Sequence, residues 1–290
     1  MVIELRKVLP LLLLFSLGGL FGVGTLHLTR QGATGVTTPE DDPLPTQPML
    51  LFVLAGQSNM SGRGALPGEQ QPNQRIFLFG NDYRWRIATE PLDDAHNQVD
   101  RISIDDDAGF SPGLTFATTL LANAPDKPIG LIPCAKGGSA IREWGQSMSD
   151  QTLYGSCLKR IRAATTRGQI AGILFFQGEA EGIAADEAAA QVYADRFSSV
   201  IESFRRDIGD PMVPLVFAQI GSYRASTPLV NWERIKAAQS TIILPCAAMI
   251  TTSDLKLQDA VHYTTPSYRL IGERFADAYI KLTTSPERCR

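Results

Sequence analysis

Short apolar runs recur along the chain and alternate with helical patterns. Five runs of β-branched and other apolar residues are bounded by turn-forming residues, at positions 50–55, 129–133, 170–176, 213–220 and 247–251. Continuous apolar runs of this length are typical of strands that are buried on both faces of a sheet. The pattern therefore predicts a sheet of five strands.

Amphipathic helical patterns lie between these strands. The clearest covers residues 193–208, and shorter ones cover 114–121, 154–161 and 271–282. In each, apolar residues recur at the spacing that places them on one face of a helix. Strands that alternate with helices predict a parallel sheet with helices on both faces. The predicted fold class is α/β, a three-layer α/β/α sandwich around a five-stranded parallel sheet.

The first thirty residues have a different character. Arg6 and Lys7 precede an almost unbroken apolar run at positions 8–28, which is typical of secretory targeting. The run is long enough to span a bilayer, and no small-residue cleavage site follows it. We predict that residues 1–30 are a signal-anchor, attached to a membrane through 8–28, or else a cleaved signal peptide. In both cases the protein is exported, to the periplasm or the extracellular space.

Residues 31–48 are rich in Gly, Thr, Pro and Asp and contain almost no large apolar side chain. Such a segment buries too little surface to offset the entropy of ordering it, so it predicts a semi-rigid linker. The folded domain is then expected at 49–290. Cys134, Cys157, Cys246 and Cys289 form an even set in an exported chain, which favours one or two disulfides. Three pairings, or buried free thiols, remain open.

Composition excludes several classes of protein. The chain has 290 residues, of which 44% are hydrophobic and 20% charged, so it is neither disordered nor fibrous. Lys and Arg number 27 against 30 Asp and Glu, a net charge of −3, which argues against nucleic-acid binding. With three His, four Cys and no Cys-x-x-Cys pair, no metal site is predicted. No protein partner is predicted either.

Polar residues with catalytic potential follow the first and last predicted strands. Ligands of parallel α/β sheets bind beyond the carboxyl ends of the strands. Ser58 follows the first strand, and His262, preceded by Asp259, follows the last. The other histidines are His27 in the targeting segment and His96 in a polar loop. Ser58, His262 and Asp259 are therefore a candidate triad, although a strand-end serine can also serve only as a helix cap.

Four short motifs follow one another along the folded part of the chain. They are Gly56-Gln57-Ser58-Asn59-Met60, Gly137-Gly138-Ser139 with Trp144, Gln177-Gly178-Glu179 and Asp259-x-x-His262. Together they resemble the blocks of carbohydrate esterase family six, the sialic-acid-specific acetylesterase and acetylxylan esterase group of the SGNH hydrolases. The resemblance runs from about Leu51 to Tyr279 and implies a flavodoxin-like fold, no cofactor and an acetylated carbohydrate as substrate.

The resemblance and the chemistry of ester hydrolysis assign a role to each residue. Ser58 is the expected nucleophile, His262 the general base and Asp259 the acid behind it, with Glu179 as the alternative acid. The expected oxyanion donors are the backbone N–H groups of Ser58 and of Gly137 or Gly138, together with the side-chain amide of Gln177. The alternatives are that the two glycines only form a turn and that Gln177 only ties loops together.

Other residues of the motifs are expected to support the site or to contact the sugar. They are Gln57, Asn59, Glu179, Arg63, Arg142 and Trp144. The run Asp105-Asp106-Asp107 is predicted to be a solvated loop, and His96 a surface histidine. Two other functions remain open: an SGNH lipid esterase or thioesterase, and a glycan-binding protein without catalytic activity.

Overall fold

A computed structural model describes residues 44–123, 126–285, 287 and 289. Its centre is one seven-stranded sheet in the order β3-β2-β4-β1-β5-β6-β7. The strands are β1 (Met49–Gly56), β2 (Ile76–Phe79), β3 (Trp85–Ile87), β4 (Ile129–Pro133), β5 (Gly168–Phe176), β6 (Leu215–Ala218) and β7 (Ala247–Ile250). All neighbouring pairs are parallel except β2 and β3, which are antiparallel.

The five predicted strands are all present, but the predicted number of strands was wrong. β2 and β3 add two strands at one edge of the sheet. β2 has only four residues, and β3 has three that are all partly exposed, including Arg86. An edge strand needs little apolar sequence because one side of it stays open to solvent. The edge strand β3 therefore forms no apolar run, whereas β2 lies between β3 and β4 and its short apolar run is buried but was not recognised.

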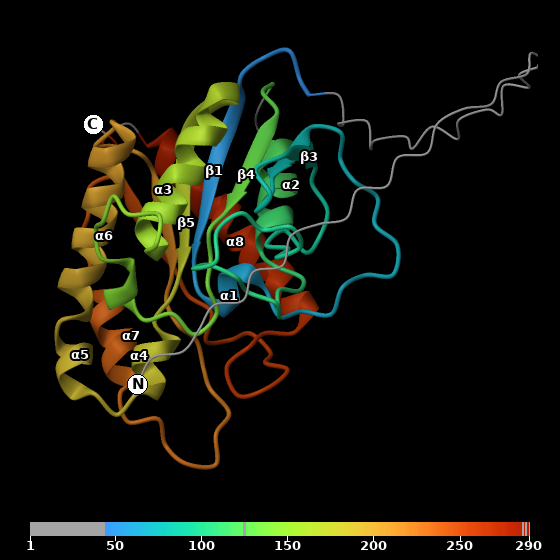
Figure 1. Ribbon diagram of the computed structural model, residues 1–290. Helices are drawn as coiled ribbons and strands as arrows, with labels where there is room; N and C mark the ends of the chain where they lie inside the picture. The colour runs from blue at the N-terminus through green and yellow to red at the C-terminus, as the bar shows by residue number, and fades with distance from the viewer. Residues whose placement is uncertain (1–43, 124–125, 286, 288, 290) are drawn as a thin grey trace, which may run out of the picture. The chain divides into compact units, whose positions relative to one another are not determined.

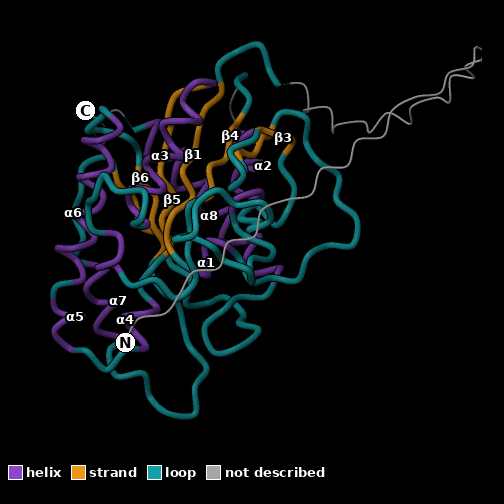
Figure 2. The backbone as a smooth tube through the Cα atoms, viewed as in Figure 1, coloured by secondary structure: helices purple, strands orange, loops and turns teal. Residues whose placement is uncertain are grey.

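Helices cover both faces of the sheet and make the predicted three layers (Figure 1). One face carries α2 (Gly113–Asn123) and α8 (Thr265–Thr284). The other carries α3 (Leu153–Ala164), α6 (Tyr193–Ile208) and α7 (Trp232–Ser240). Figure 2 shows the strands between these two groups of helices. The shorter elements are α1 (Ser58–Ser61), η1 (Ile141–Trp144), η2 (Thr165–Arg167), α4 (Glu179–Ile183) and α5 (Glu187–Gln191).

Aromatic contacts join the layers. Phe52 of β1 packs edge-on against Phe116 of α2, with ring centroids 4.9 Å apart. On the opposite face, Phe197 of α6 packs against Phe175 of β5 at 5.3 Å and Phe217 of β6 at 5.0 Å. The apolar stripe predicted for residues 193–208 is thus the face that α6 buries against the sheet. The edge-to-face pairs Phe52–Phe116 and Phe175–Phe197 add to the free energy gained by burying the rings.

Both disulfides left open by the sequence are formed. The first disulfide, Cys134–Cys157, joins the end of β4 to α3 with Cα atoms 5.4 Å apart. The second, Cys246–Cys289, joins the loop before β7 to the segment after α8 with Cα atoms 4.4 Å apart. None of the described cysteines is free. This selects one of the three possible pairings.

The predicted targeting segment, residues 1–30 with the apolar run 8–28, lies outside the described residues. Most of the predicted linker 31–48 does so as well, so the boundaries at 30 and 48 stay predictions. Among the residues that the structure describes, no helix is long and apolar enough to cross a membrane.

Candidate active site

The carboxyl ends of β1, β4, β5 and β7 bring the sequence motifs to one edge of the sheet. β1 lies between β4 and β5, so the loops after these three strands are neighbours. In Figure 1, α1 lies at the lower end of β1, directly after the strand. This is the edge at which parallel α/β sheets bind ligands.

A sharp turn at the end of β1 presents Ser58. Gly56 has φ +130°, and a Cβ atom there would lie 2.0 Å from the carbonyl oxygen of Phe176 on β5. Only glycine fits such a backbone conformation and so close an approach. Ser58 is then the first residue of α1, so its N–H has no hydrogen-bond acceptor within the helix.

Ser58, His262 and Asp259 form a continuous chain of short contacts. Ser58 Oγ lies 2.9 Å from Nε2 of His262, and Nδ1 of the same ring lies 2.8 Å from Oδ2 of Asp259. The other carboxylate oxygen of Asp259 accepts the backbone N–H groups of Val261 at 3.0 Å and His262 at 2.8 Å. The carboxylate therefore holds both the imidazole and the loop that carries it.

The electrostatics of Asp259 suit this arrangement. Partial burial alone would raise the pKa of its carboxyl, but the two backbone N–H groups and the imidazole of His262 outweigh that effect and lower it. Asp259 is thus an anion at neutral pH. A charged carboxylate at Nδ1 fixes the imidazole tautomer that leaves Nε2 free to take a proton.

Glu179 lies near the site but bonds to Asn59 rather than to His262. Asn59 Nδ2 donates to Glu179 Oε1 at 2.5 Å and to the carbonyl of Val261 at 3.1 Å. The Tyr268 hydroxyl donates to Asn59 Oδ1 at 2.7 Å. Burial raises the pKa of Glu179 to about 7, and its Oε2 has no partner in the described part of the chain. These contacts make Asp259 the acid that faces His262.

Two glycines after β4 stand in different environments. The N–H of Gly137 donates to Asp105 at 2.8 Å, so it is occupied. Gly138 has φ +71° and is exposed, and its N–H has no acceptor in the region that the structure describes. Of the two predicted backbone donors, Gly138 is the one that remains available to a ligand.

Gln177 agrees with the alternative that it ties loops together rather than with the expected oxyanion role. Its Nε2 donates to Glu181 at 2.7 Å and to the carbonyl of Ser139 at 3.1 Å, while Tyr193 donates to its Oε1 at 2.9 Å. The side chain is 1% exposed. The structure therefore directs this amide into the protein interior and not toward Ser58.

A cavity of about 650 Å³ opens over Ser58 and His262. Small-molecule sites usually have volumes of roughly this size. The residues around it come from all four strand-end loops and from the loop before α2. They are Gln57, Ser58, Arg63, Ile104, Asp105, Asp106, Asp107, Lys136, Gly137, Gly138, Glu179, Ala180, Ile183, Val261 and His262.

Comparison with known families decides the class of this site. The family described as "Carbohydrate esterase, sialic acid-specific acetylesterase" matches residues 48–281. The chain belongs to this family. The resemblance predicted from the four motifs is thereby confirmed, and the protein is a carboxylic ester hydrolase of the carbohydrate esterase class.

Individual relatives agree with this assignment. A protein of Arabidopsis thaliana named a probable carbohydrate esterase is 30% identical over 267 residues, which cover 84% of the esterase and 96% of the relative. The crystal structure of an Arabidopsis thaliana protein matches with a TM-score of 0.70 and 29% identity, covering 81% and 98% of the two chains. NanS matches with a TM-score of 0.63 and 18% identity, covering 83% and 99%, which shows the fold alone.

The acidic run of the esterase is solvated only in part: Asp106 and Asp107 are exposed, as expected, but Asp105 is not. Asp105 is buried, receives two hydrogen bonds from Arg63 at 2.7 and 3.0 Å, and accepts the Ser61 hydroxyl at 2.7 Å. Burial alone would raise the pKa of Asp105, but Arg63 and Ser61 lower it instead. Asp106 and Asp107 line the cavity. Arg63 is therefore engaged with Asp105, beside the substrate cavity.

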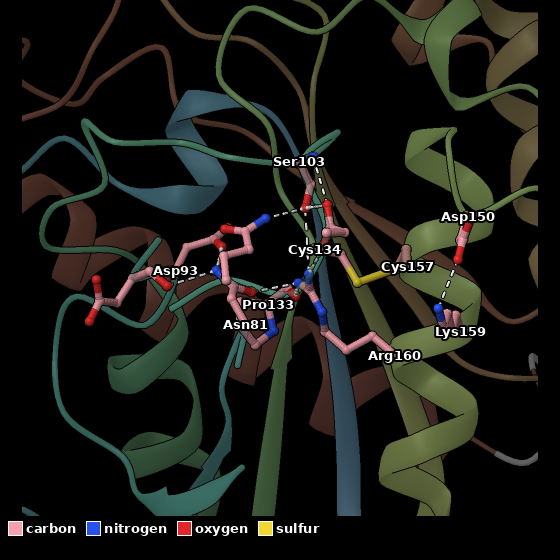
Figure 3. Close-up of polar contacts among 12 residues, drawn as sticks. Asn81, Asp93, Ser103, Pro133, Cys134, Asp150, Cys157, Lys159 and Arg160 are labelled. Carbon is pink, nitrogen blue, oxygen red and sulfur yellow. Dashed lines mark hydrogen bonds and ion pairs between the residues drawn. A yellow bond between two sulfur atoms is a disulfide. The ribbon is translucent and has the colours of Figure 1, made fainter. Parts of the chain in front are cut away.

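The loop that carries Asp105, Asp106 and Asp107 is anchored at its start by a buried arginine (Figure 3). Arg160 of α3 pairs with Asp100 at 2.5 Å, and it also donates to Asn81 and to the carbonyl of Pro133 at the end of β4. Figure 3 shows the guanidinium beside the first disulfide, which joins the same strand end to the same helix. The loop that forms one wall of the cavity is therefore tied to β4 and α3.

Two of the residues expected to support the site or to contact the sugar do not line the cavity. Trp144 is fully buried, donates to Ser139 Oγ at 3.1 Å and packs against Phe175. Arg142 is exposed on η1 and does not line the cavity. His96 lies on the surface, as predicted. The resemblance located the segment that contains Trp144 and Arg142, but not the direction of their side chains.

Besides the acidic run, five further residues that line the cavity were missed, one of which is Val261. The other four are Ile104, Lys136, Ala180 and Ile183. Lys136 follows β4 closely, so the strand-end rule could have identified it. Ile104 belongs to a loop between β3 and α2, and no pattern in the sequence places that loop over Ser58.

Proposed function

We propose that the esterase removes O-acetyl groups from an acetylated carbohydrate through a covalent acetyl-enzyme on Ser58. The observation that carries the proposal is the chain of contacts from Ser58 Oγ to His262 at 2.9 Å and from His262 to Asp259 at 2.8 Å. A nucleophile, a base and an orienting acid at hydrogen-bond distances are what acyl transfer needs.

The reaction follows from the placement of these groups. Ser58 Oγ attacks the ester carbonyl carbon while His262 Nε2 takes the hydroxyl proton. The tetrahedral intermediate then breaks its bond to the sugar oxygen, which receives that proton from His262. Water, deprotonated by the same imidazole, releases acetate from Ser58. The N–H groups of Ser58 and Gly138 are the donors proposed for the oxyanion of each intermediate.

The lining of the cavity favours a sugar ester over a long-chain lipid ester. Its apolar side chains are Ile104, Ala180, Ile183 and Val261, and the remaining lining is polar, charged or glycine. A long acyl chain gains affinity by burying apolar side chains, and only four of the lining residues carry one. Sugar hydroxyls, by contrast, can bond to the many donors and acceptors present.

We infer that the protein works outside the cytoplasm. The apolar run at 8–28 after Arg6 and Lys7 supports export. The two disulfides support it as well, because disulfides persist mainly in oxidising compartments.

The test uses the full chain and its Ser58→Ala variant. We expect acetate release from acetylated xylan or O-acetylated sialic acid, hydrolysis of p-nitrophenyl acetate in preference to the octanoate, and no turnover by Ser58→Ala at an unchanged melting temperature. If folded wild-type protein hydrolyses none of these esters, the function is that of a binding protein instead. If the octanoate is preferred, the substrate is a lipid ester.

A further inference from the structure

Among the residues that the structure describes, Gln57 is the only one with an amide side chain that lines the cavity. It directly precedes Ser58 and is the N-cap residue of α1. Its side chain is largely buried, so its hydrogen-bonding capacity must be met by the protein or by a ligand.

Two donors fix the orientation of the Gln57 amide. Its Oε1 faces the backbone N–H of Ala180 at 3.3 Å and Nε2 of Gln177 at 3.4 Å. Both groups can only donate, so the oxygen of Gln57 must point toward them and the nitrogen away. The Nε2 of Gln57 has no acceptor in the described part of the chain, which leaves its two hydrogens for a ligand.

Gln177 cannot take the same position without losing its own bonds. The two hydrogens of its Nε2 are shared among three acceptors, Glu181 at 2.7 Å, the carbonyl of Ser139 at 3.1 Å and Gln57 Oε1 at 3.4 Å, and its Oε1 accepts from Tyr193. All these partners are buried. Turning the amide toward Ser58 would leave buried donors and acceptors unpaired, which is unfavourable.

We propose that Gln57 Nε2 is the side-chain donor of the oxyanion hole, together with the N–H groups of Ser58 and Gly138, and that Gln177 is a positioning residue that orients Gln57. The proposal rests on the proposed function, because it concerns the oxyanion formed by attack of Ser58. Gln57 only donates hydrogen bonds, so no proton or covalent bond is transferred to it. The donor is held before the substrate arrives, which is the condition for transition-state stabilisation.

Removal of the donor should affect turnover rather than binding. Loss of one oxyanion donor typically lowers kcat by about 10²–10³-fold. KM should change little, because the bond is strongest to the charged intermediate and weak to the neutral ester. A residue with a merely structural role would instead lower stability and the fraction of active protein.

The experiment measures kcat and KM of the full chain on p-nitrophenyl acetate. The variants are Gln57→Met, Gln177→Met and the double variant, with Gln169→Met, an exposed position on β5, as the matched control. We expect Gln57→Met to lower kcat at least a hundredfold with KM within threefold, Gln169→Met to match wild type, and the double variant to be no worse than Gln57→Met. Overturning results would be kcat within threefold of wild type for Gln57→Met, or a larger loss for Gln177→Met than for Gln57→Met.

A second variant and a second readout exclude a failure to fold. Gln57→Glu keeps the oxygen that accepts from Ala180 but has no donor, so it should fold and lose turnover like Gln57→Met. A trifluoromethyl ketone forms an anionic adduct with a nucleophilic serine, and its inhibition constant should rise by the same factor as kcat/KM falls. An unchanged inhibition constant would overturn the proposal. If wild type is inactive or Ser58→Ala remains active, the proposed function itself fails, which is a different outcome.

Discussion

Asn59 Nδ2 donates a hydrogen bond of 3.1 Å to the carbonyl oxygen of Val261, which joins the residue after Ser58 to the residue before His262. The two partners are 202 positions apart in the sequence. The amide of Asn59 also bonds to Glu179 and Tyr268, so it links three separate segments in the protein interior. We infer that this amide helps to set the distance between Ser58 Oγ and the imidazole of His262.

Replacement of Asn59 by alanine should therefore lower both activity and stability. Three buried groups, on Glu179, Val261 and Tyr268, lose their partner, and each unpaired buried group costs about 1–3 kcal/mol. We expect a lower free energy of unfolding in denaturant titrations and a reduced kcat on p-nitrophenyl acetate. Asn123→Ala, at the exposed end of α2, is the control. Wild-type kcat in Asn59→Ala would show that the link has no catalytic role.

The contacts of His262 predict which acid matters most. Asp259→Asn keeps the size of the side chain but removes the charge at Nδ1, and in serine hydrolases such a change lowers kcat by up to about 10⁴-fold. Glu179→Gln keeps an oxygen for Asn59 and should leave kcat within tenfold of wild type. The measurement is kcat for both variants under the same conditions. A larger loss for Glu179→Gln would identify Glu179 as the functional acid.

Stability should fall as pH rises through neutrality. Burial raises the pKa of Glu90 to about 8 and that of Glu179 to about 7. Between the ordinary carboxyl pKa and these values the folded state binds more protons than the unfolded state, so the free energy of unfolding decreases with increasing pH. Glu90→Gln should make the decrease between pH 5 and pH 8 smaller, as measured by urea titration at both pH values. An identical decrease in the variant would contradict the raised pKa of Glu90.

The sequence predicted the centre of the fold better than its edge. β1, β4, β6 and the second half of β5 are buried, so burial itself selected the apolar runs that were recognised there, and β7 is partly buried. The helix over 193–208 has the predicted bounds. Its apolar residues recur at helical spacing over 16 residues, which is too long for a strand. β3 was missed because its three residues are only partly buried at the edge of the sheet, whereas β2 was missed although it is buried and as long as β6 and β7.

The candidate triad could be predicted because its members follow strand ends and histidines are few. The contacts around it could not. Asn59 meets Val261, and Asp105 meets Arg63, through loops whose course depends on the whole fold. The direction of a side chain was equally hidden, as the buried amide of Gln177 shows.

The pair of Arg160 and Asp100 supports one wall of the cavity, and a double-mutant cycle can measure its contribution. Both side chains are buried, at 1% and 9% exposed, and their charged atoms lie 2.5 Å apart. Removing one member leaves the other charge buried without a partner, which costs about 3–5 kcal/mol, whereas removing both is far less destabilising.

We therefore expect Arg160→Met and Asp100→Asn each to lower the free energy of unfolding. The loss in the double variant should be smaller than the sum of the two single losses. The loop that follows Asp100 carries Asp106 and Asp107 into the cavity, so Arg160→Met should also raise KM for an acetylated sugar. The exposed pair of Lys159 and Asp150, on the same helix and the loop before it, is the matched control and should show coupling of about 0–1 kcal/mol. Strict additivity for Arg160 and Asp100 would show that the pair does not hold this wall in place.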